Sequence, residues 1–217
     1  MQTTPFWTEQ FLRPDDLPIG ENIPNEVDVA IVGSGYTGLN AARVFAQSGA
    51  QVAVLERNTI GWGASSRNGG MATPGIKQSL KEIIRRYGKA KGREFWQASL
   101  DAIYLLEQLI LDELLDCDWE RKGHIALAYK PAHFEHLRKV NQWYKDEFGY
   151  ETILVAPSDL RTEIGTHAFY GGLSNELSGG LQPANYVFGL AYAVARHGAH
   201  LCEHTDVTHI ERNRSGF

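Results

Sequence analysis

Three glycines, Gly33, Gly35 and Gly38, stand at the spacing G-x-G-x-x-G between a β-branched run and a helical pattern. The run at 27–32 is typical of a strand buried on both faces, and apolar residues at helical spacing follow from Leu39. The first glycine permits a tight turn, the second lets backbone N–H groups approach an anion, and the third lets the helix pack closely on the sheet. The free N–H groups and the dipole of a helix N-terminus favour a diphosphate at this place.

A carboxylate completes the pattern. Residues 51–55 are typical of a second buried strand, and Glu56 follows it directly. A carboxylate at this position accepts hydrogen bonds from the hydroxyls of an adenosine ribose and repels a 2′-phosphate, which disfavours NADP. The sequence therefore predicts a dinucleotide site in a Rossmann-type unit. The alternative is a glycine turn in some other β–α–β unit.

The segment after the second strand separates two cofactors that the glycine motif alone does not distinguish. A nicotinamide dehydrogenase usually enters another helix there, whereas this chain continues with a glycine- and serine-rich loop at 60–70. Such a loop can lie along an extended cofactor and donate backbone N–H groups to its phosphates and flavin ring. This favours FAD over NAD.

Together these segments resemble the D-amino-acid oxidase / glycine oxidase family of flavoproteins, and within it the γ-glutamylputrescine oxidase-like members. Three motifs carry the resemblance: Val-x-Ile-Val-Gly-x-Gly-Tyr-Thr-Gly-Leu at 29–39, Val-Leu-Glu at 54–56, and Gly-x-Gly-Ala-Ser-x-Arg-Asn-Gly-Gly at 61–70. It continues through 171–173, 179–183 and 198–210, while residues 76–165 match loosely.

The resemblance implies a role for each matching residue. The FAD diphosphate would lie against Gly33, Ser34, Gly35, Tyr36, Thr37 and Gly38, and Glu56 with Arg57 beside it would bind the adenosine ribose. Val207 would offer backbone hydrogen bonds to adenine. The loop would follow the cofactor towards its flavin end through Ser65, Ser66, Arg67, Asn68, Gly69 and Gly70.

The implied reaction is oxidation of the C–N bond of an amine or amino acid, polyamine derivatives included. Hydride passes from the carbon next to nitrogen to the flavin, giving an imine, and reoxidation by oxygen yields peroxide unless another acceptor serves. The small-molecule substrate is the expected partner. The residues point to no particular catalytic base.

The expected fold is α/β, with a Rossmann-like FAD-binding domain interrupted by part of an α+β substrate domain. We expect an irregular N-terminal arm at 1–25, anchored by Phe6, Trp7 and Phe11. The FAD-binding domain takes 26–78 and 182–217, and the helical segment with the partial substrate domain takes 79–181. Further helices are expected within 76–116, 132–147 and 184–197, and further strands at 124–129, 152–155 and 200–203.

Length adds a further expectation. Members of the resembled family continue for about as long again beyond the adenine-contacting strand, so we expect this chain to be an incomplete fragment. The alternative is a short subunit completed by a partner chain that supplies the C-terminal half.

Two other groups of residues could carry chemistry. His197, His200, Cys202 and His204 resemble a metal site, but the strand among them is expected to be an ordinary sheet element, so no metal is predicted. The acidic group Asp112, Glu113, Asp116, Asp118 and Glu120 is expected to be a solvated helix end. The aromatic residues between Trp96 and Trp143 are interpreted as core or interface, with a lid over substrate as the alternative.

Composition narrows the class of protein. A formal net charge of -5 argues against nucleic acid or an anionic membrane surface as the main partner. The N-terminus has no basic region followed by an apolar one, and no apolar run reaches the roughly 20 residues that span a bilayer, which together favour a cytoplasmic protein. Two rivals stay open: an NAD-linked dehydrogenase, and a non-catalytic flavin-binding subunit of a larger complex.

Overall fold

A computed structural model describes residues 6–20, 22–212 and 216–217. Its internal contacts divide the chain into two compact units. The first unit comprises residues 1–70, 109–118 and 181–217, and the second comprises 71–108 and 119–180. The sequence pattern contained no sign that the short segment 109–118 belongs with the first unit.

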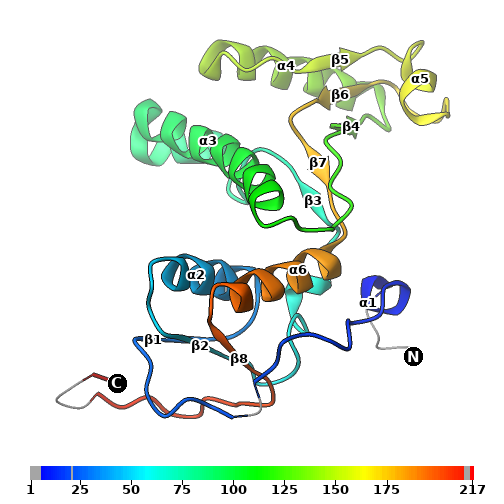
Figure 1. Cartoon of the computed structure of the whole chain (residues 1–217). Helices are drawn as coiled ribbons and strands as arrows, with labels where there is room; N and C mark the ends of the chain where they lie inside the picture. Colours follow the sequence, from blue (N-terminus) through cyan, green and yellow to red (C-terminus); the bar gives the residue numbers. More distant parts are fainter. Residues whose placement is uncertain (1–5, 21, 213–215) are drawn as a thin grey trace. The chain divides into compact units, whose positions relative to one another are not determined.

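The first unit is built on a parallel sheet. Its strands are β1 (Val29–Val32), β2 (Val52–Leu55) and β8 (His200–Cys202), in the order β1-β2-β8. Helices α2 (Tyr36–Gln47) and α6 (Pro183–Arg196) pack against each other on one face of this sheet (Figure 1). The predicted Rossmann-like α/β fold is confirmed.

The three strands are not equally buried. Val52 and Val54 of β2 are fully buried between their neighbours, as the continuous apolar run predicted. In β1, however, burial alternates, and Val32 is 60% exposed. The prediction that β1 is buried on both faces is therefore wrong for this structure, because β1 is the edge strand and α2 covers only one of its faces.

The helices of the first unit end where the sequence places stop and start signals. Gly49 follows α2 with a φ of 87°, a left-handed conformation that glycine adopts without steric cost. At the start of α6, Pro183 occupies the first turn, and the side chain of Gln182 accepts a hydrogen bond from the backbone N–H of Asn185 at 2.7 Å.

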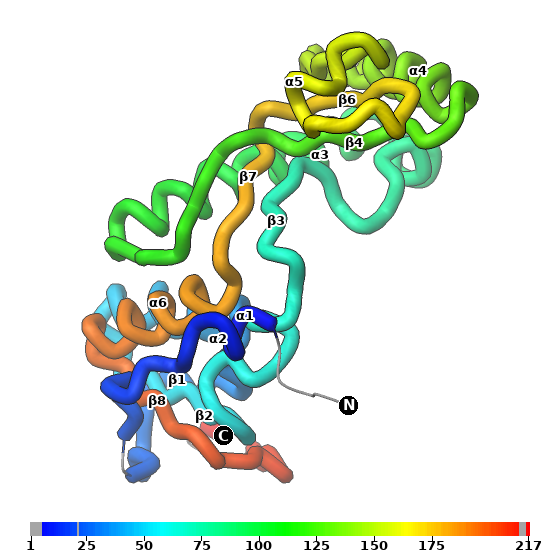
Figure 2. Tube along the Cα trace, turned by 90° about the vertical axis from the view of Figure 1, so that its right-hand side faces the viewer, coloured from blue at the N-terminus to red at the C-terminus, as the bar shows by residue number. Residues whose placement is uncertain are grey.

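The N-terminal arm contains a short helix, α1 (Phe6–Gln10), which lies beside α6 (Figure 2). Further along the arm, Arg13 forms an ion pair with Glu203 at 2.7 Å, and Ile19 makes a parallel bridge to Leu201 of β8. The expected anchoring by Phe6 is wrong, because this side chain is 64% exposed.

The second unit contains two antiparallel sheets. One pairs β3 (Met71–Ala72) with β7 (Gly179–Gly180). The other has the order β4-β6-β5, with β4 at His124–Leu127, β5 at Ile153–Val155 and β6 at Gly172–Asn175. Its helices are α4 (Pro131–Phe148), α5 (Leu160–Ile164) and most of α3 (Leu80–Asp112), which is interrupted at Gly88 by a φ of 87°.

Aromatic side chains form the core of the second unit. Trp96 is buried with Leu80 and Ile83, and the rings of Tyr144 and Tyr150 pack against it with centroids 5.0 and 4.9 Å away. Aromatic rings packed at these separations stabilise the fold by more than the burial of their apolar area alone. This part of the aromatic group is core, as the sequence indicated.

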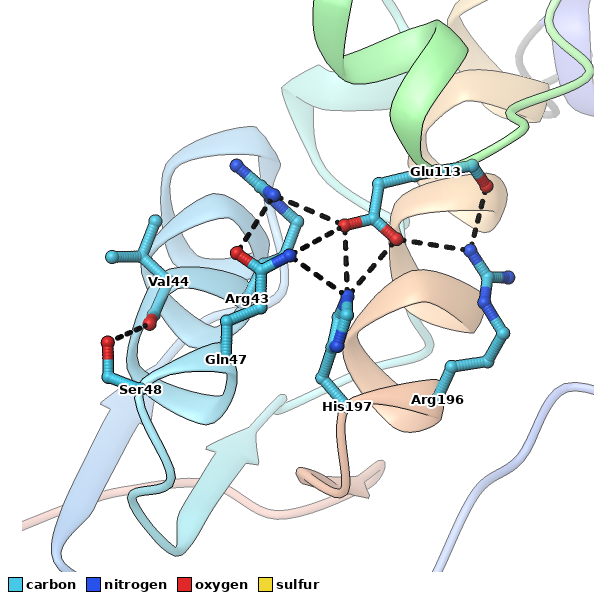
Figure 3. Close-up of polar contacts among 7 residues, drawn as sticks. All are labelled: Arg43, Val44, Gln47, Ser48, Glu113, Arg196 and His197. Atoms are coloured by element: carbon cyan, nitrogen blue, oxygen red, sulfur yellow. Dashed lines mark hydrogen bonds and ion pairs between the residues drawn. The ribbon is translucent and has the colours of Figure 1, made fainter.

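A buried carboxylate joins three segments of the first unit (Figure 3). The Glu113 side chain is 5% exposed, and its Oε1 accepts hydrogen bonds from Arg43 Nη1 and Gln47 Nε2 of α2, both at 3.1 Å. His197 Nε2, at the end of α6, lies 3.0 Å from the same oxygen. Arg196 Nη2 donates to Oε2 at 3.2 Å and to the Glu113 carbonyl at 2.7 Å.

The expectation that Glu113 belongs to a solvated helix end is therefore wrong. Its partners come from positions far away in the chain, so the local run of acidic residues gave no indication of them. Burial raises the pKa of Glu113, but the hydrogen bonds from His197 and Arg43 and their charges outweigh it, and the pKa lies below its ordinary value.

We predict that Glu113→Gln lowers the free energy of unfolding of the first unit by about 2–4 kcal/mol. The amide would turn one N–H donor towards the donors of Arg43 or Arg196 and leave cations without their counter-charge. The pKa of Glu113 is depressed in the folded state. The contribution of its carboxylate to folding stability is therefore complete above the ordinary carboxyl pKa and is lost as the pH falls through the depressed pKa.

Urea unfolding of the wild type and the variant between neutral and acid pH measures this difference. Asp116→Asn is the control, since Asp116 is exposed in the same segment. The prediction fails if Glu113→Gln costs no more than the control, or if the difference from wild type grows on acidification.

Candidate functional site

The turn after β1 opens directly into the first turn of α2. Gly33 has a φ of 96°, and its N–H donates to the Leu55 carbonyl of β2 at 2.9 Å. Gly35 then precedes α2 as its N-cap, with no side chain to cover the helix end. The N-terminus of a helix of this length is a site that favours anions, because its first N–H groups have no partner within the helix.

Gly38 holds α2 against the turn. A Cβ atom built on Gly38 would lie 2.1 Å from the Gly33 carbonyl oxygen and 3.3 Å from Cγ2 of Ile31. Only a residue without a side chain allows the helix to begin this close to β1. The role expected of the third glycine, close packing of helix on strand, is visible in these distances.

A pocket of about 370 Å³ opens at this helix end. It is formed by the β1–α2 turn together with the loop that follows β2. Seven of the residues predicted to bind the cofactor meet there, and Val32 and Ala64, which sequence reasoning did not name, complete the wall. The lining residues are Val32, Gly33, Gly35, Tyr36, Thr37, Gly38, Ala64, Ser65 and Asn68.

The glycine- and serine-rich loop is ordered by its own hydrogen bonds. It contains a short 3-10 helix, η1 (Ala64–Ser66). Ser65 Oγ accepts from the backbone N–H of Tyr36 at 3.1 Å, which ties the loop to the first residue of α2. Asn68 donates to the Ser65 carbonyl at 3.0 Å and accepts from the Gly70 N–H at 2.8 Å, so it closes the end of the loop.

Other predicted residues of this loop lie outside the pocket wall. Ser66 is fully buried and donates to the Gly61 carbonyl at 2.5 Å. Arg67 stacks over the Trp62 ring, with its Cζ 4.5 Å from the ring centroid, and donates to the Trp62 carbonyl. Gly69 is exposed, and Gly70 takes a φ of 69°, where a Cβ atom would lie 2.1 Å from a backbone oxygen. The structure thus gives Ser66, Arg67 and Gly70 contacts that shape the loop.

Glu56 is held at the end of β2 by the neighbouring turn. Its Oε2 accepts from the backbone N–H of Ser34 at 2.9 Å and from the Ser34 hydroxyl at 2.8 Å, while Oε1 accepts from the N–H of Asn58 at 2.9 Å. Ser34 is 1% exposed, so it holds the carboxylate from the protein interior and does not line the pocket. Arg57 follows Glu56 directly in the chain and is exposed.

These contacts keep the Glu56 carboxylate ionised. Burial raises its pKa, but the hydrogen bonds from Asn58 and Ser34, with the charge of Arg57, outweigh burial and lower the pKa below its ordinary value. A carboxylate accepts about four hydrogen bonds, so acceptor capacity for a further hydroxyl remains.

Val207 lies in the irregular segment after β8 and is half-buried. It is not among the residues that line the pocket. Two backbone hydrogen bonds hold the preceding residues beside the end of β2: Thr205 N–H donates to the Glu56 carbonyl at 2.8 Å, and His204 N–H donates to the Asn58 carbonyl at 3.0 Å. The segment that carries Val207 therefore starts next to Glu56.

Two of the four residues that resembled a metal site, His197 and Cys202, have other surroundings in the structure. His197 contacts Glu113, and Cys202 is buried in β8. Over the part of the chain that the structure describes, no three His, Cys, Asp or Glu side chains gather as metal ligands would. No helix in that part has both the length and the apolar character needed to cross a membrane.

The sequence also matches a family model for FAD-dependent oxidoreductases, the DAO family, over residues 28–217. The chain belongs to this family. The match contains the glycine turn, Glu56, the loop at 60–70 and the segment with Val207, and FAD is the cofactor of the family.

Named relatives share the same region. The "Probable oxidoreductase OrdL" of Haemophilus influenzae is 34% identical over 188 residues, and the γ-glutamylputrescine oxidoreductase of Escherichia coli is 29% identical over 184. Those matches cover 86% and 85% of this chain, and 43% of each relative. The crystal structure of glycine oxidase from Geobacillus kaustophilus superposes with a TM-score of 0.76 at 25% identity, over 88% of this chain and 50% of that one. The chain thus spans about half the length of these relatives.

The pocket suits the diphosphate of FAD. The first turn of α2 lines the pocket at Thr37 and Gly38, while the N–H of Tyr36 is bound by Ser65 Oγ. A Cβ on Gly35 would lie 3.0 Å from the same Ser65 oxygen. Glu56 provides an ionised acceptor beside the same turn. The donors and the acceptor therefore match the two polar parts of an adenosine diphosphate.

We predict that Gly38→Ala destabilises the first unit by about 1–3 kcal/mol, because the new methyl group forces α2 away from the Gly33 carbonyl. Displacing the helix end also weakens FAD binding, by about tenfold or more. Urea unfolding and a fluorescence titration with FAD measure the two effects.

Gly63→Ala is the matched control, because a Cβ on Gly63 meets no atom within 4 Å and its φ of -80° suits any residue. Equal behaviour of the two variants would show that the close approach at Gly38 has no special importance.

Proposed function

We propose that the protein is an FAD-dependent oxidoreductase that oxidises the C–N bond of an amine or amino acid. The observation that carries the proposal is the pocket at the α2 N-terminus, with Glu56 beside it, in a chain that belongs to a family of FAD enzymes. The names of its relatives, γ-glutamylputrescine oxidoreductase and glycine oxidase, support this substrate class, and polyamine derivatives are included in it. Since the chain spans about half of these relatives, the activity is proposed for the whole protein.

The proposed contacts follow the geometry of the first unit. Backbone N–H groups of the β1–α2 turn hold the diphosphate, and the Glu56 carboxylate accepts hydrogen bonds from the adenosine ribose. Ser65 and Asn68 border the diphosphate on the loop side. The backbone of Val207 meets adenine, and the loop up to Gly70 leads towards the flavin end.

When bound, FAD would accept the hydride from the carbon next to nitrogen and pass the electrons to oxygen, with peroxide as product, or to another acceptor. The residues of this site would bind and orient the cofactor: backbone N–H groups donate hydrogen bonds to the diphosphate, and Glu56 holds the ribose and excludes NADP by its charge. The imine released by the oxidation is hydrolysed by water.

The test uses the protein expressed from its complete gene. The purified protein should carry flavin absorbance, and under anaerobic conditions an amine or amino acid should bleach it. A panel of glycine, other amino acids, simple amines and γ-glutamylated diamines identifies the substrate class. Bound nicotinamide nucleotide in place of flavin, or flavin that no member of the panel reduces, would contradict the proposal.

We predict that Glu56→Gln weakens FAD binding by about tenfold, because the amide loses the charge-assisted hydrogen bonds to ribose. Because the pKa of Glu56 is depressed, wild-type affinity should stay constant above the ordinary carboxyl pKa and fall as the pH drops through the depressed value. The affinity of the variant for FAD should not fall in this acid range, because the amide does not titrate.

Fluorescence titrations at a series of pH values measure both effects. Glu163→Gln on α5 removes the same charge at a different place and serves as the control. An unchanged affinity for FAD in Glu56→Gln would contradict the proposed contact between Glu56 and the ribose.

A further inference from the structure

The side chain of Trp7 joins the N-terminal arm to the glycine- and serine-rich loop at 60–70. Trp7 of α1 donates its indole N–H to the carbonyl oxygen of Asn68 at 2.7 Å. Asn68 lines the pocket at the α2 N-terminus. The family model begins at residue 28, so this contact comes from a part of the chain that the family pattern does not include.

Asn68 is the residue that closes the loop. Its side-chain amide donates to the carbonyls of Ser65 and Ala64 at 3.0 and 3.3 Å, and its Oδ1 accepts from the Gly70 N–H at 2.8 Å. The same amide lies 3.4 Å from the hydroxyl of Tyr36, on the first turn of α2. The Asn68 side chain is therefore committed to the loop and to α2, while its main-chain carbonyl is bound by the arm.

Trp7 is itself fixed at a second point. Its carbonyl oxygen accepts from the Phe11 N–H at 3.0 Å, and the side chain of Gln182 donates to it at 3.4 Å. Gln182 is 2% exposed and is the N-cap residue of α6. Trp7 thus connects the glycine- and serine-rich loop with the start of α6, and both of these segments lie in the first unit.

The rest of the arm is held firmly enough to position α1. Arg13 pairs with Glu203, Leu17 is buried, and the Tyr192 hydroxyl donates to Asp16. Ile19 continues the sheet beside Leu201. With these anchors downstream, the orientation of Trp7 is restricted before any cofactor binds, and less conformational freedom remains to be lost on binding.

We propose that Trp7 is a positioning residue that holds the Asn68 end of the loop in the conformation that walls the pocket. Its link to FAD rests on the proposed function, but its effect on the loop does not. A loop that is ordered in advance binds a ligand more tightly than one that must be ordered during binding.

The test compares Trp7→Phe, which keeps an aromatic ring but removes the N–H donor, with Phe6→Leu. Phe6 is exposed and packs edge-on against Trp7, so its replacement disturbs the arm without removing the hydrogen bond. Deletion of residues 1–10 is a second variant that removes the indole altogether. All are made in the protein expressed with the full sequence that its gene encodes.

The first measurement is amide hydrogen exchange of the FAD-free protein. The described loop amides with acceptors include those of Ile60, Trp62, Ser66, Arg67 and Gly70. In Trp7→Phe and in the deletion, the exchange rates of these loop amides should rise by about three- to tenfold. In Phe6→Leu the exchange rates should stay close to those of the wild type, and the melting temperature should change little in all three variants. The second measurement is FAD affinity, which should fall by about three- to tenfold in the same two variants.

The outcomes separate the two proposals. Faster loop exchange in a protein that does not bind FAD would support the role of Trp7 and contradict the proposed function. Loop exchange that is unchanged in Trp7→Phe, or that rises equally in Phe6→Leu, would overturn the role of Trp7 whatever the affinity for FAD.

Discussion

The close approach of α2 to the end of β1 is the constraint on which the rest of the first unit depends. A carbonyl oxygen of the turn lies where a side chain of Gly38 would otherwise begin. This contact fixes where the helix starts, and so fixes where its unpaired N–H groups point. The loop after β2, the support of Glu56 by Ser34 and the pocket itself are all arranged around that helix end.

Two sets of polar contacts support this arrangement, one near each end of α2, and they act in different ways. The hydrogen bonds from Ser34 and Asn58 orient the Glu56 carboxylate and lower its pKa, so the acceptor is charged and in place. The Glu113 cluster, by contrast, holds α2 against α6 from the other end of the helix, through Arg43 and His197. One set prepares a binding site, and the other keeps the helix that carries the site in position.

Much of this site could be predicted from the sequence because its determinants are local. Gly33, Gly35 and Gly38 signal a turn and a helix start by their spacing alone, and Glu56 follows a recognisable strand. The role of Glu113 could not be predicted, because neighbouring acidic residues imitate an exposed helix end and its partners are distant in the chain. The exposure of Val32 and the contact of Trp7 with Asn68 also depend on the assembled fold, since neither leaves a periodic signal in the sequence.

We propose that the N-terminus of α2 receives the diphosphate of FAD, and this placement can be observed residue by residue. It is tested most directly by titrating FAD into protein labelled with ¹⁵N at glycine and following the backbone amide resonances. With the diphosphate at this helix end, the largest shifts are expected at Gly33, Gly35 and Gly38, with Gly63 less affected. Large shifts confined to glycines of the second unit, such as Gly123 and Gly149, with those three unchanged, would contradict it.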